Sequence, residues 1–415
     1  QVIRKSASDR VIAMDPATRL YFIDVEEPDM HEPTGDLERV KRALEEQWQI
    51  TGVQAELTLL RRLQPALRKG EWKITVALNK GNHDTDYHLL DLWPGYHEGP
   101  LLGLAIDLGS TTIAAHLCDL TDGKVLASAG VMNPQIRFGE DLMSRVSYGI
   151  MNPGGAAEMT KAVIAGLQML IDGAAKQAGL SGEDIVELVL VGNPVMHHLL
   201  LGIDPVELGG APFALAVDAA MDVRAAELGI TINPGGRVYI LPCIAGHVGA
   251  DAAAVVLAEA PQKADEMTLI VDVGTNAEIV VGNKDRLLAA SSPTGPAFEG
   301  AQISSGQRAA PGAIERIRID KDTLEPKFRV IGVDLWSDED GFDAAVEKTG
   351  VTGICGSGII EVLGEMYLAE IITMDGVIDG SKAAQNSRIE ADDRTFSYRI
   401  TDTVSVTQND VRAIQ

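Results

Sequence analysis

The chain has 415 residues, 46% of them hydrophobic and 4% aromatic, and its formal net charge is −25. This length allows two or three domains with substantial cores. The lack of Lys and Arg clusters excludes a nucleic-acid-binding surface, and the interruption of apolar runs by Gly, Asp or Pro excludes a membrane-spanning segment.

Residues 1–99 are predicted to form a linker and a small α/β middle domain without a catalytic constellation. The apolar patterns predict strands at 9–16, 19–25 and 72–78, and helices at 34–48 and 55–67. His83, His88 and His97 lie in a polar stretch that contains Gly and Pro. We interpret them as loop histidines in preference to metal ligands.

Residues 100–264 are predicted to form the first of two lobes, and they begin with a β-hairpin. An apolar run leads into Asp107, and Gly109, Ser110, Thr111 and Thr112 precede another apolar run. Glycine lets the backbone approach an anion closely, and successive N–H groups and hydroxyls donate to phosphate oxygens. An Asp at the end of the strand can hold Mg²⁺ directly or through water. The hairpin tip therefore has the composition of a phosphate-binding site.

The rest of the first lobe follows an α/β pattern. The elements expected are a third hairpin strand at 124–128, helices near 142, at 156–178 and at 252–260, and strands at 185–191 and 238–242. The strand at 185–191 ends in Gly192, Asn193 and Pro194, so its carboxyl end is expected at the ligand-binding edge of the sheet. His197 and His198 begin the next helix, where we favour a core or capping role over a place in the cleft.

Residues 265–415 are predicted to form the second lobe, because the hairpin pattern repeats after 165 positions. Asp272, Gly274, Thr275 and Asn276 correspond to the first tip. Two such hairpins facing each other would clamp a nucleotide, with Asp107 and Asp272 positioning catalytic Mg²⁺. The tip residues that would donate to the phosphates are Gly109, Ser110, Thr111, Thr112, Gly274, Thr275 and Asn276.

Two further segments of the second lobe matter. Gly356, Ser357 and Gly358 precede a helix expected to open at Ile359, and such a turn suits an adenosine ribose or a phosphate. Residues 408–415 have the pattern of the first turns of a helix.

The two hairpins and the 353–358 turn resemble the acetate and sugar kinase, Hsp70 and actin superfamily. More narrowly, five ordered motifs resemble the reductive activators of corrinoid proteins, and the likeness runs from about residue 8 to the end. These motifs lie at residues 133–135, 191–197, 249–251, 295–301 and 308–315. The resemblance implies a cytoplasmic, homodimeric ATPase that returns Co(II) to Co(I) in a corrinoid protein of a methyltransferase system. It also implies that an N-terminal [2Fe–2S] ferredoxin domain supplies the electron.

The chain departs from this family pattern in two ways. Cys118, Cys243 and Cys355 are widely spaced, so we expect buried thiols of a reducing compartment instead of a metal or iron–sulfur site. The chain also opens at Gln1 without an initiator Met or an apolar leader, and it stops before the second lobe of its relatives ends. We therefore expect a fragment whose cluster domain and last segment are missing.

Three other functions are compatible with the motifs. A small-molecule kinase of the same fold needs a general base, for which Asp251 and Glu140 are candidates. An activator of 2-hydroxyacyl-CoA dehydratases needs cluster cysteines, a requirement that Cys243 and Cys355 satisfy poorly. A chaperone-like or regulatory nucleotide-binding module needs neither.

Overall fold

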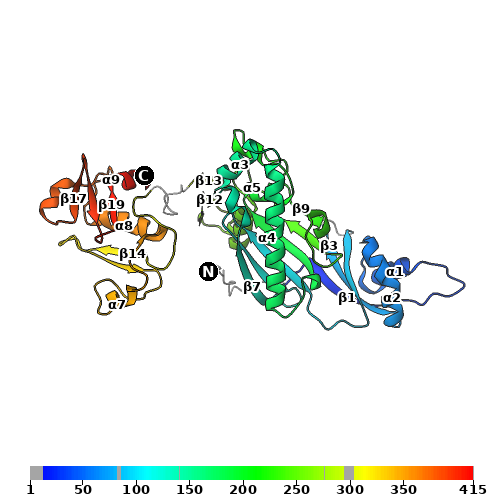
Figure 1. Ribbon diagram of the computed structural model, residues 1–415. Helices are drawn as coiled ribbons and strands as arrows, with labels where there is room; N and C mark the ends of the chain where they lie inside the picture. Colours follow the sequence, from blue (N-terminus) through cyan, green and yellow to red (C-terminus); the bar gives the residue numbers. More distant parts are fainter. Residues whose placement is uncertain (1–12, 82–85, 140, 275, 294–302, 415) are drawn as a thin grey trace. The chain divides into compact units, whose positions relative to one another are not determined.

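Figure 1 shows the computed structural model, which describes residues 13–81, 86–139, 141–274, 276–293 and 303–414. The chain divides into two compact units. The first contains residues 1–270 and 280–290, and the second contains residues 271–279 and 291–415. Each unit is a mixed α/β structure and is described by itself.

The first unit begins with a small sheet whose strand order is β1-β3-β4-β2. Its elements are β1 (Thr18–Asp24), α1 (Asp36–Trp48), β2 (Val53–Ala55), α2 (Leu57–Lys69), β3 (Lys73–Lys80) and β4 (Tyr87–Pro94). The apolar faces of both helices and the sheet share one core, which includes Val40, Leu44, Leu63 and Val76. Burial of these aliphatic side chains is the main stabilising contribution to such a domain.

Two expectations for this region were wrong. Residues 13–16 lie outside any strand, and the remainder of the predicted strand at 9–16 lies outside the described residues. His88 belongs to β4 instead of a loop. His97 does follow the strand, where its ring stacks on Trp93 with ring centroids 4.1 Å apart, whereas His83 lies outside the described residues.

Buried polar contacts attach the small sheet to the larger sheet of the first unit. The Asp91 carboxylate, only 6% exposed, accepts a hydrogen bond of 2.6 Å from the Asn233 side chain and pairs with Arg62 at 2.7 Å. A Cβ atom at Gly235 would lie 2.1 Å from the Leu90 carbonyl oxygen, so only glycine fits there. These contacts explain why both sheets form one compact unit.

The larger sheet has six strands in the order β7-β6-β5-β8-β10-β9. Its strands are β5 (Leu102–Leu108), β6 (Thr112–Asp119), β7 (Val125–Met132), β8 (Ile185–Gly192), β9 (Met221–Arg224) and β10 (Arg237–Ile240). Strands β5, β6 and β7 form the predicted antiparallel meander, and β8 is parallel to both β5 and β10. The carboxyl ends of three parallel strands therefore meet at one edge, near Leu108, Gly192 and Ile240.

Four helices accompany this sheet: α3 (Leu142–Met151), α4 (Gly155–Gln177), α5 (Pro194–Leu200) and α6 (Ala250–Glu259). The long helix α4 lies across the face of the sheet in Figure 1. Its Val163, Leu167 and Leu170 are buried in the core between the helix and the sheet. Helix α4 agrees closely with the helix predicted at 156–178.

The remaining residues form three small sheets, ordered β11-β12-β13, β15-β14-β16 and β17-β18-β19. Their strands are β11 (Thr268–Val273), β12 (Asn276–Gly282), β13 (Leu287–Pro293), β14 (Ala313–Ile319), β15 (Pro326–Val330), β16 (Gly353–Ile354), β17 (Ile389–Asp392), β18 (Thr395–Arg399) and β19 (Ser405–Thr407). The helices are α7 (Phe342–Val346), α8 (Gly356–Leu368) and α9 (Gln408–Ile414). Ile314, Val362 and Met366 help to form the core of the second unit, and α9 confirms the helical start predicted at 408–415.

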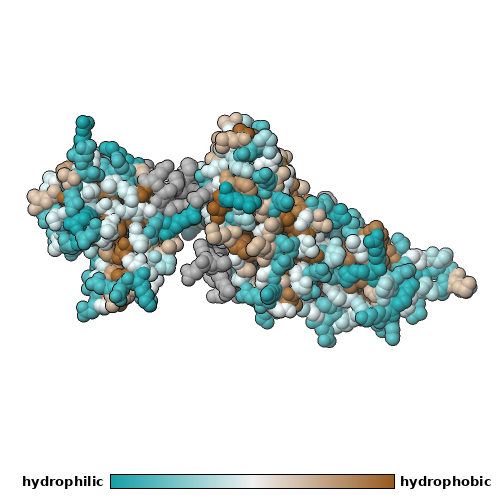
Figure 2. Space-filling view, in the orientation of Figure 1, coloured by the Kyte–Doolittle hydropathy of each residue, from teal (hydrophilic) through white to brown (hydrophobic). Residues whose placement is uncertain are grey.

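Much of the visible surface of the small N-terminal domain is hydrophilic, over both its sheet and its helices (Figure 2). Among the described residues, no helix is both long enough and apolar enough to cross a membrane.

Candidate nucleotide-binding site

The first predicted hairpin is present and has a tight tip. Leu108 pairs with Ile113 and Asp107 with Ala114, so residues 109–112 close the connection between β5 and β6. A Cβ atom at Gly109 would lie 2.5 Å from the backbone oxygen of Thr112, and this clash makes glycine necessary. Asp107 is half-buried and is the last residue but one of strand β5, where it pairs with Val191 near the end of β8.

Three successive carbonyl groups of the tip accept hydrogen bonds from a neighbouring polar segment. The Asn133 side chain donates to the Gly109 carbonyl at 2.9 Å, and the Asn133 backbone N–H donates to the Thr111 carbonyl at 2.8 Å. The Arg145 guanidinium donates to the Ser110 carbonyl. The tip is therefore held from one side by residues that follow β7.

This anchoring fixes the direction of the amide donors. In a trans peptide unit the N–H points opposite to the preceding carbonyl, and the only cis bond among the described residues is Ala211–Pro212. The N–H groups of Ser110 and Thr111 therefore point away from the anchoring side. Within the described part of the chain, neither of them donates a hydrogen bond. Successive amides without acceptors fit a phosphate group.

Two other segments reach the same edge of the sheet. Asn193 caps α5 by accepting a hydrogen bond of 3.0 Å from the Met196 N–H. A Cβ atom at Gly249 would lie 2.6 Å from both the Asn193 Cα and the Gly192 carbonyl oxygen, so the start of α6 packs directly on the end of β8. Asp251, in the first turn of α6, is thereby brought to this edge. The other candidate base, Glu140, lies outside the described residues.

His197 and His198 are core residues, as we favoured, with exposed fractions of 2% and 1%. His198 Nδ1 lies 3.0 Å from the Pro194 carbonyl oxygen, and its Nε2 accepts a hydrogen bond of 2.9 Å from the Ala216 N–H. This arrangement requires the neutral imidazole. Burial lowers the pKa of His197 to about 4 and also lowers the pKa of His198.

The second hairpin is also present, in β11 and β12. Its Gly274 N–H donates to the Asn276 carbonyl at 2.9 Å, and Asp272 is exposed before the turn. Thr275 lies outside the described residues. Because Asp107 and Asp272 belong to different units, their joint action on one nucleotide stays a prediction.

The Gly356, Ser357 and Gly358 turn is the first turn of α8, which begins three residues earlier than expected. A Cβ atom at Gly358 would lie 2.3 Å from the Ile314 carbonyl oxygen. Close packing of α8 on β14 thus accounts for this glycine without a ligand. Gly356 is half-buried and Ser357 is exposed, so these two residues keep the surface position that a ligand would need.

The three cysteines are free thiols, but Cys118 is half-buried and not buried as we expected. Cys243 and Cys355 are buried, and burial raises the pKa of Cys243 to about 11, which keeps this thiol protonated. Within the described ranges, no group of three or more His, Cys, Asp or Glu side chains is arranged to hold a metal ion.

A glycine-containing hairpin tip at the carboxyl edge of an α/β sheet is typical of nucleotide-binding lobes. Three family models match successive parts of the chain: the RACo linker region at 7–99, the RACo middle region at 102–263, and the C-terminal domain of RACo, described as the ASKHA domain, at 266–415. The chain belongs to the RACo family, and its ASKHA domain implies nucleotide binding.

Characterised relatives agree with this assignment. The corrinoid activation enzyme RamQ of Eubacterium limosum is 32% identical over 331 residues, which are 77% of this chain and 53% of the relative. The Co(II) methylated amine-specific corrinoid protein reductase of Methanosarcina barkeri is 27% identical over 225 residues, which are 52% of this chain and 40% of the relative. A solved structure of a reductive activator for corrinoid, iron–sulfur protein matches all of this chain and 64% of its own, with a TM-score of 0.77 and 32% identity. The chain thus spans about half the length of the curated relatives that it matches.

Proposed function

We propose that this chain is the nucleotide-dependent part of an enzyme that reductively activates a corrinoid protein, returning Co(II) to Co(I) in a methyltransferase system. The observation that carries the proposal is the anchored hairpin tip, whose Ser110 and Thr111 amides point away from their anchoring segment. Membership of the RACo family and the functions of two relatives supply the substrate class.

In this proposal each site residue has a defined role. Asp107 and Asp272 supply carboxylate oxygens for Mg²⁺, because hard cations prefer oxygen ligands. The tip residues donate hydrogen bonds to the phosphates, and the start of α8 binds the ribose or a phosphate. The residues concerned are Gly109, Ser110, Thr111, Thr112, Gly274, Thr275, Asn276, Gly356, Ser357 and Gly358. Among them, Gly274 contributes close approach of the backbone, because its N–H already donates to the Asn276 carbonyl. Hydrolysis of bound MgATP would supply the free energy for the unfavourable reduction. It would also release the complex after electron transfer, so that the cycle can begin again.

The electron source and the assembly are also proposed. We place the [2Fe–2S] centre outside residues 1–415, because the three separated cysteines of this chain cannot ligate such a cluster. The linker and small domain occupy residues 1–99, and the two lobes occupy 100–264 and 265–415. The partner is a corrinoid protein, and the assembly is a cytoplasmic homodimer without nucleic-acid or membrane contacts.

A small-molecule kinase is the second candidate, and the position of Asp251 at the ligand edge favours it. The two functions differ in the fate of the terminal phosphate. A kinase transfers it to a substrate hydroxyl, whereas the activator releases it as inorganic phosphate. Incubation with labelled ATP and the corrinoid protein separates the two, since only the activator yields labelled inorganic phosphate without a phosphorylated small molecule.

ATP is expected to change the affinity for the corrinoid protein, because a ligand that binds two conformations differently shifts their populations. Coupling between two binding sites is reciprocal, so the corrinoid protein must change ATP affinity by the same factor. Calorimetric titration of the Co(II) corrinoid protein, with and without a non-hydrolysable ATP analogue, measures this factor. Equal partner affinities under both conditions would remove the proposed coupling.

A further inference from the structure

We propose that Arg145 is a positioning residue for the nucleotide: its buried guanidinium fixes the donor geometry of the hairpin tip and provides the positive charge that faces the bound phosphates through the tip backbone. This inference rests on the proposed nucleotide site. The sequence patterns did not single out Arg145.

Arg145 is a completely buried cation held by neutral acceptors. Its guanidinium donates to the Gly139 carbonyl at 3.0 Å and to the Ser110 carbonyl of the tip. The same group donates to the side-chain oxygen of Gln135 at 3.2 Å and to the Met196 sulfur at 3.0 Å. Among the described residues, Arg145 forms no ion pair with a carboxylate.

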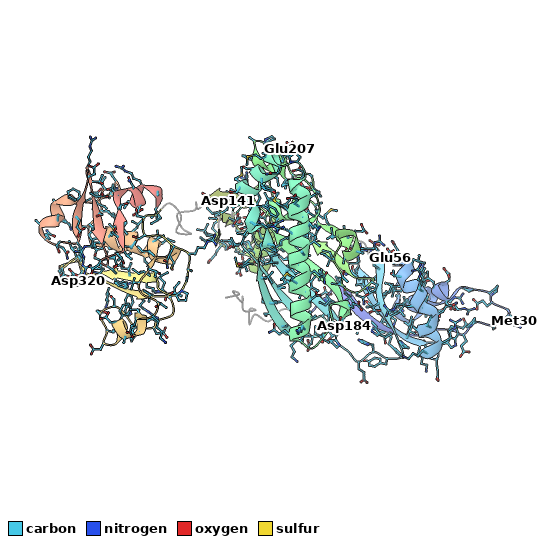
Figure 3. The ribbon with its side chains drawn as sticks, in the orientation of Figure 1. Met30, Glu56, Asp141, Asp184, Glu207 and Asp320 are labelled. Carbon is cyan, nitrogen blue, oxygen red and sulfur yellow. The ribbon has the colours of Figure 1, made fainter. Side chains whose placement is uncertain are left out.

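The Asp141 carboxylate has an electrostatic effect on this cation but is already engaged elsewhere. Asp141 lies at the start of α3 (Figure 3) and accepts hydrogen bonds from the Ser144 N–H at 2.7 Å and the Ser144 hydroxyl at 2.9 Å. Burial lowers the pKa of Arg145 to about 10, and Asp141 opposes that change. The guanidinium is therefore still charged at neutral pH.

A buried charge without an ion-pair partner is costly, because water is lost and neutral dipoles replace it incompletely. An anion bound on the other side of the tip would offset this cost. The Ser110 carbonyl and the Thr111 N–H belong to one planar peptide unit. The bond from Arg145 therefore orients a phosphate donor, and the guanidinium charge polarises the same peptide toward the anion.

The Asn133 and Gln135 motif completes this tip-anchoring cluster, which we define as Asn133, Gln135, Arg145 and Met196. The backbone N–H of Gln135 donates to the Asn133 side-chain oxygen at 2.9 Å, which leaves the Asn133 amide nitrogen to hold the tip. The Gln135 amide nitrogen donates to the Met159 carbonyl at 2.8 Å, so its oxygen faces Arg145. The motif thereby orients Asn133 and Arg145, the two residues whose side chains donate to the tip carbonyls.

The chain offers a matched control in Arg39, which is 2% exposed. Its guanidinium also donates to backbone carbonyls, those of Thr34, Glu27 and Glu32, but it does so in the small N-terminal domain. Arg39→Met and Arg145→Met each remove one buried guanidinium and keep an apolar stem of similar length. General destabilisation therefore affects both variants, whereas loss of tip positioning affects only the second.

The experiment uses the full chain and measures two quantities. Calorimetry gives the MgATP affinity, and hydrogen exchange without nucleotide is followed at the Asn133 backbone amide, which donates to the Thr111 carbonyl of the tip at 2.8 Å. We expect Arg145→Met to weaken MgATP binding by about tenfold or more, since a charge-assisted contact is lost. We expect Arg39→Met to bind as the wild type does. Arg145→Lys keeps the charge but lacks the planar fork, so it should restore only part of the affinity.

Exchange at the tip separates this inference from the proposed function. Faster exchange of the Asn133 backbone amide in Arg145→Met than in Arg39→Met supports positioning of the tip. A wild type that binds no nucleotide would remove the proposed function and, with it, the nucleotide role of Arg145. Unchanged Asn133 exchange together with wild-type affinity in Arg145→Met would overturn the inference alone. Equal loss of affinity in both variants would also overturn it, because that result indicates general destabilisation.

Discussion

Asp107→Asn will remove most ATP hydrolysis while leaving the fold intact. The substitution keeps the shape of the side chain but removes one negative charge at the end of β5, beside the anchored tip. The charge of Mg²⁺ and phosphate is then less well compensated in the transition state. Loss of one such electrostatic group ordinarily costs about 3 kcal/mol, or roughly a hundredfold in turnover. Steady-state release of inorganic phosphate measures the effect, and circular dichroism checks the fold.

Asp272→Asn should have an effect of similar size, because the second hairpin carries the same type of carboxylate before its turn. Asp122→Asn is the matched control, because this substitution removes the same charge from an exposed turn between β6 and β7. Near-wild-type turnover in both Asp107→Asn and Asp272→Asn would refute the site assignment. An equal loss of ATP turnover in Asp122→Asn would show that the change in net charge, and not the site, causes the effect.

Acidification from pH 7.5 to pH 5 should lower the free energy of unfolding through His197 by about 2 kcal/mol. The folded pKa of His197 is about 4, below its ordinary value of 6.5. The unfolded chain therefore binds more protons between these two values, and stability falls as the pH drops through 6.5 toward 4. The pKa of His198 is lowered in the same direction and adds to the effect.

Urea unfolding at pH 7.5, 6.5 and 5 measures this dependence, and His197→Asn provides the comparison because it cannot be protonated in this range. The variant should lose part of the pH dependence whatever its stability at pH 7.5. A slope as steep as that of the wild type would show that His197 is not the titrating group. His31, on an exposed part of the small domain, is the control position for the same substitution.

The meander, the glycine-containing hairpin tips and the long helix of the first lobe were predictable because local patterns define them. Alternating apolar residues indicate β5 to β7, glycine followed by hydroxyl residues indicates the tip, and helical periodicity indicates α4. Both predicted glycine turns are present, but glycine is required for a different reason in each. Gly109 permits a tight tip, whereas Gly358 permits the close approach of α8 to β14.

Other features depend on partners that are distant in the sequence. His88 lies in a polar stretch that we expected to be a loop, yet the stretch contains β4, whose Asp91 carboxylate bonds Asn233, 142 positions away. Arg145 is similar: an arginine in a helix is usually exposed to solvent, but this one is buried and bonds the Ser110 carbonyl, 35 positions away. A local pattern cannot show that such a polar side chain is buried and satisfied. The anchoring of the tip therefore became visible only in the structure.

In the proposed function, ATP drives the one-electron reduction of a bound corrinoid from Co(II) to Co(I). The most direct test follows the cobalt absorption spectrum of the corrinoid protein, mixed with the full protein and a low-potential electron donor, with and without MgATP. We predict that the Co(I) spectrum forms only when MgATP is present. Identical Co(I) yields without ATP would contradict energy coupling.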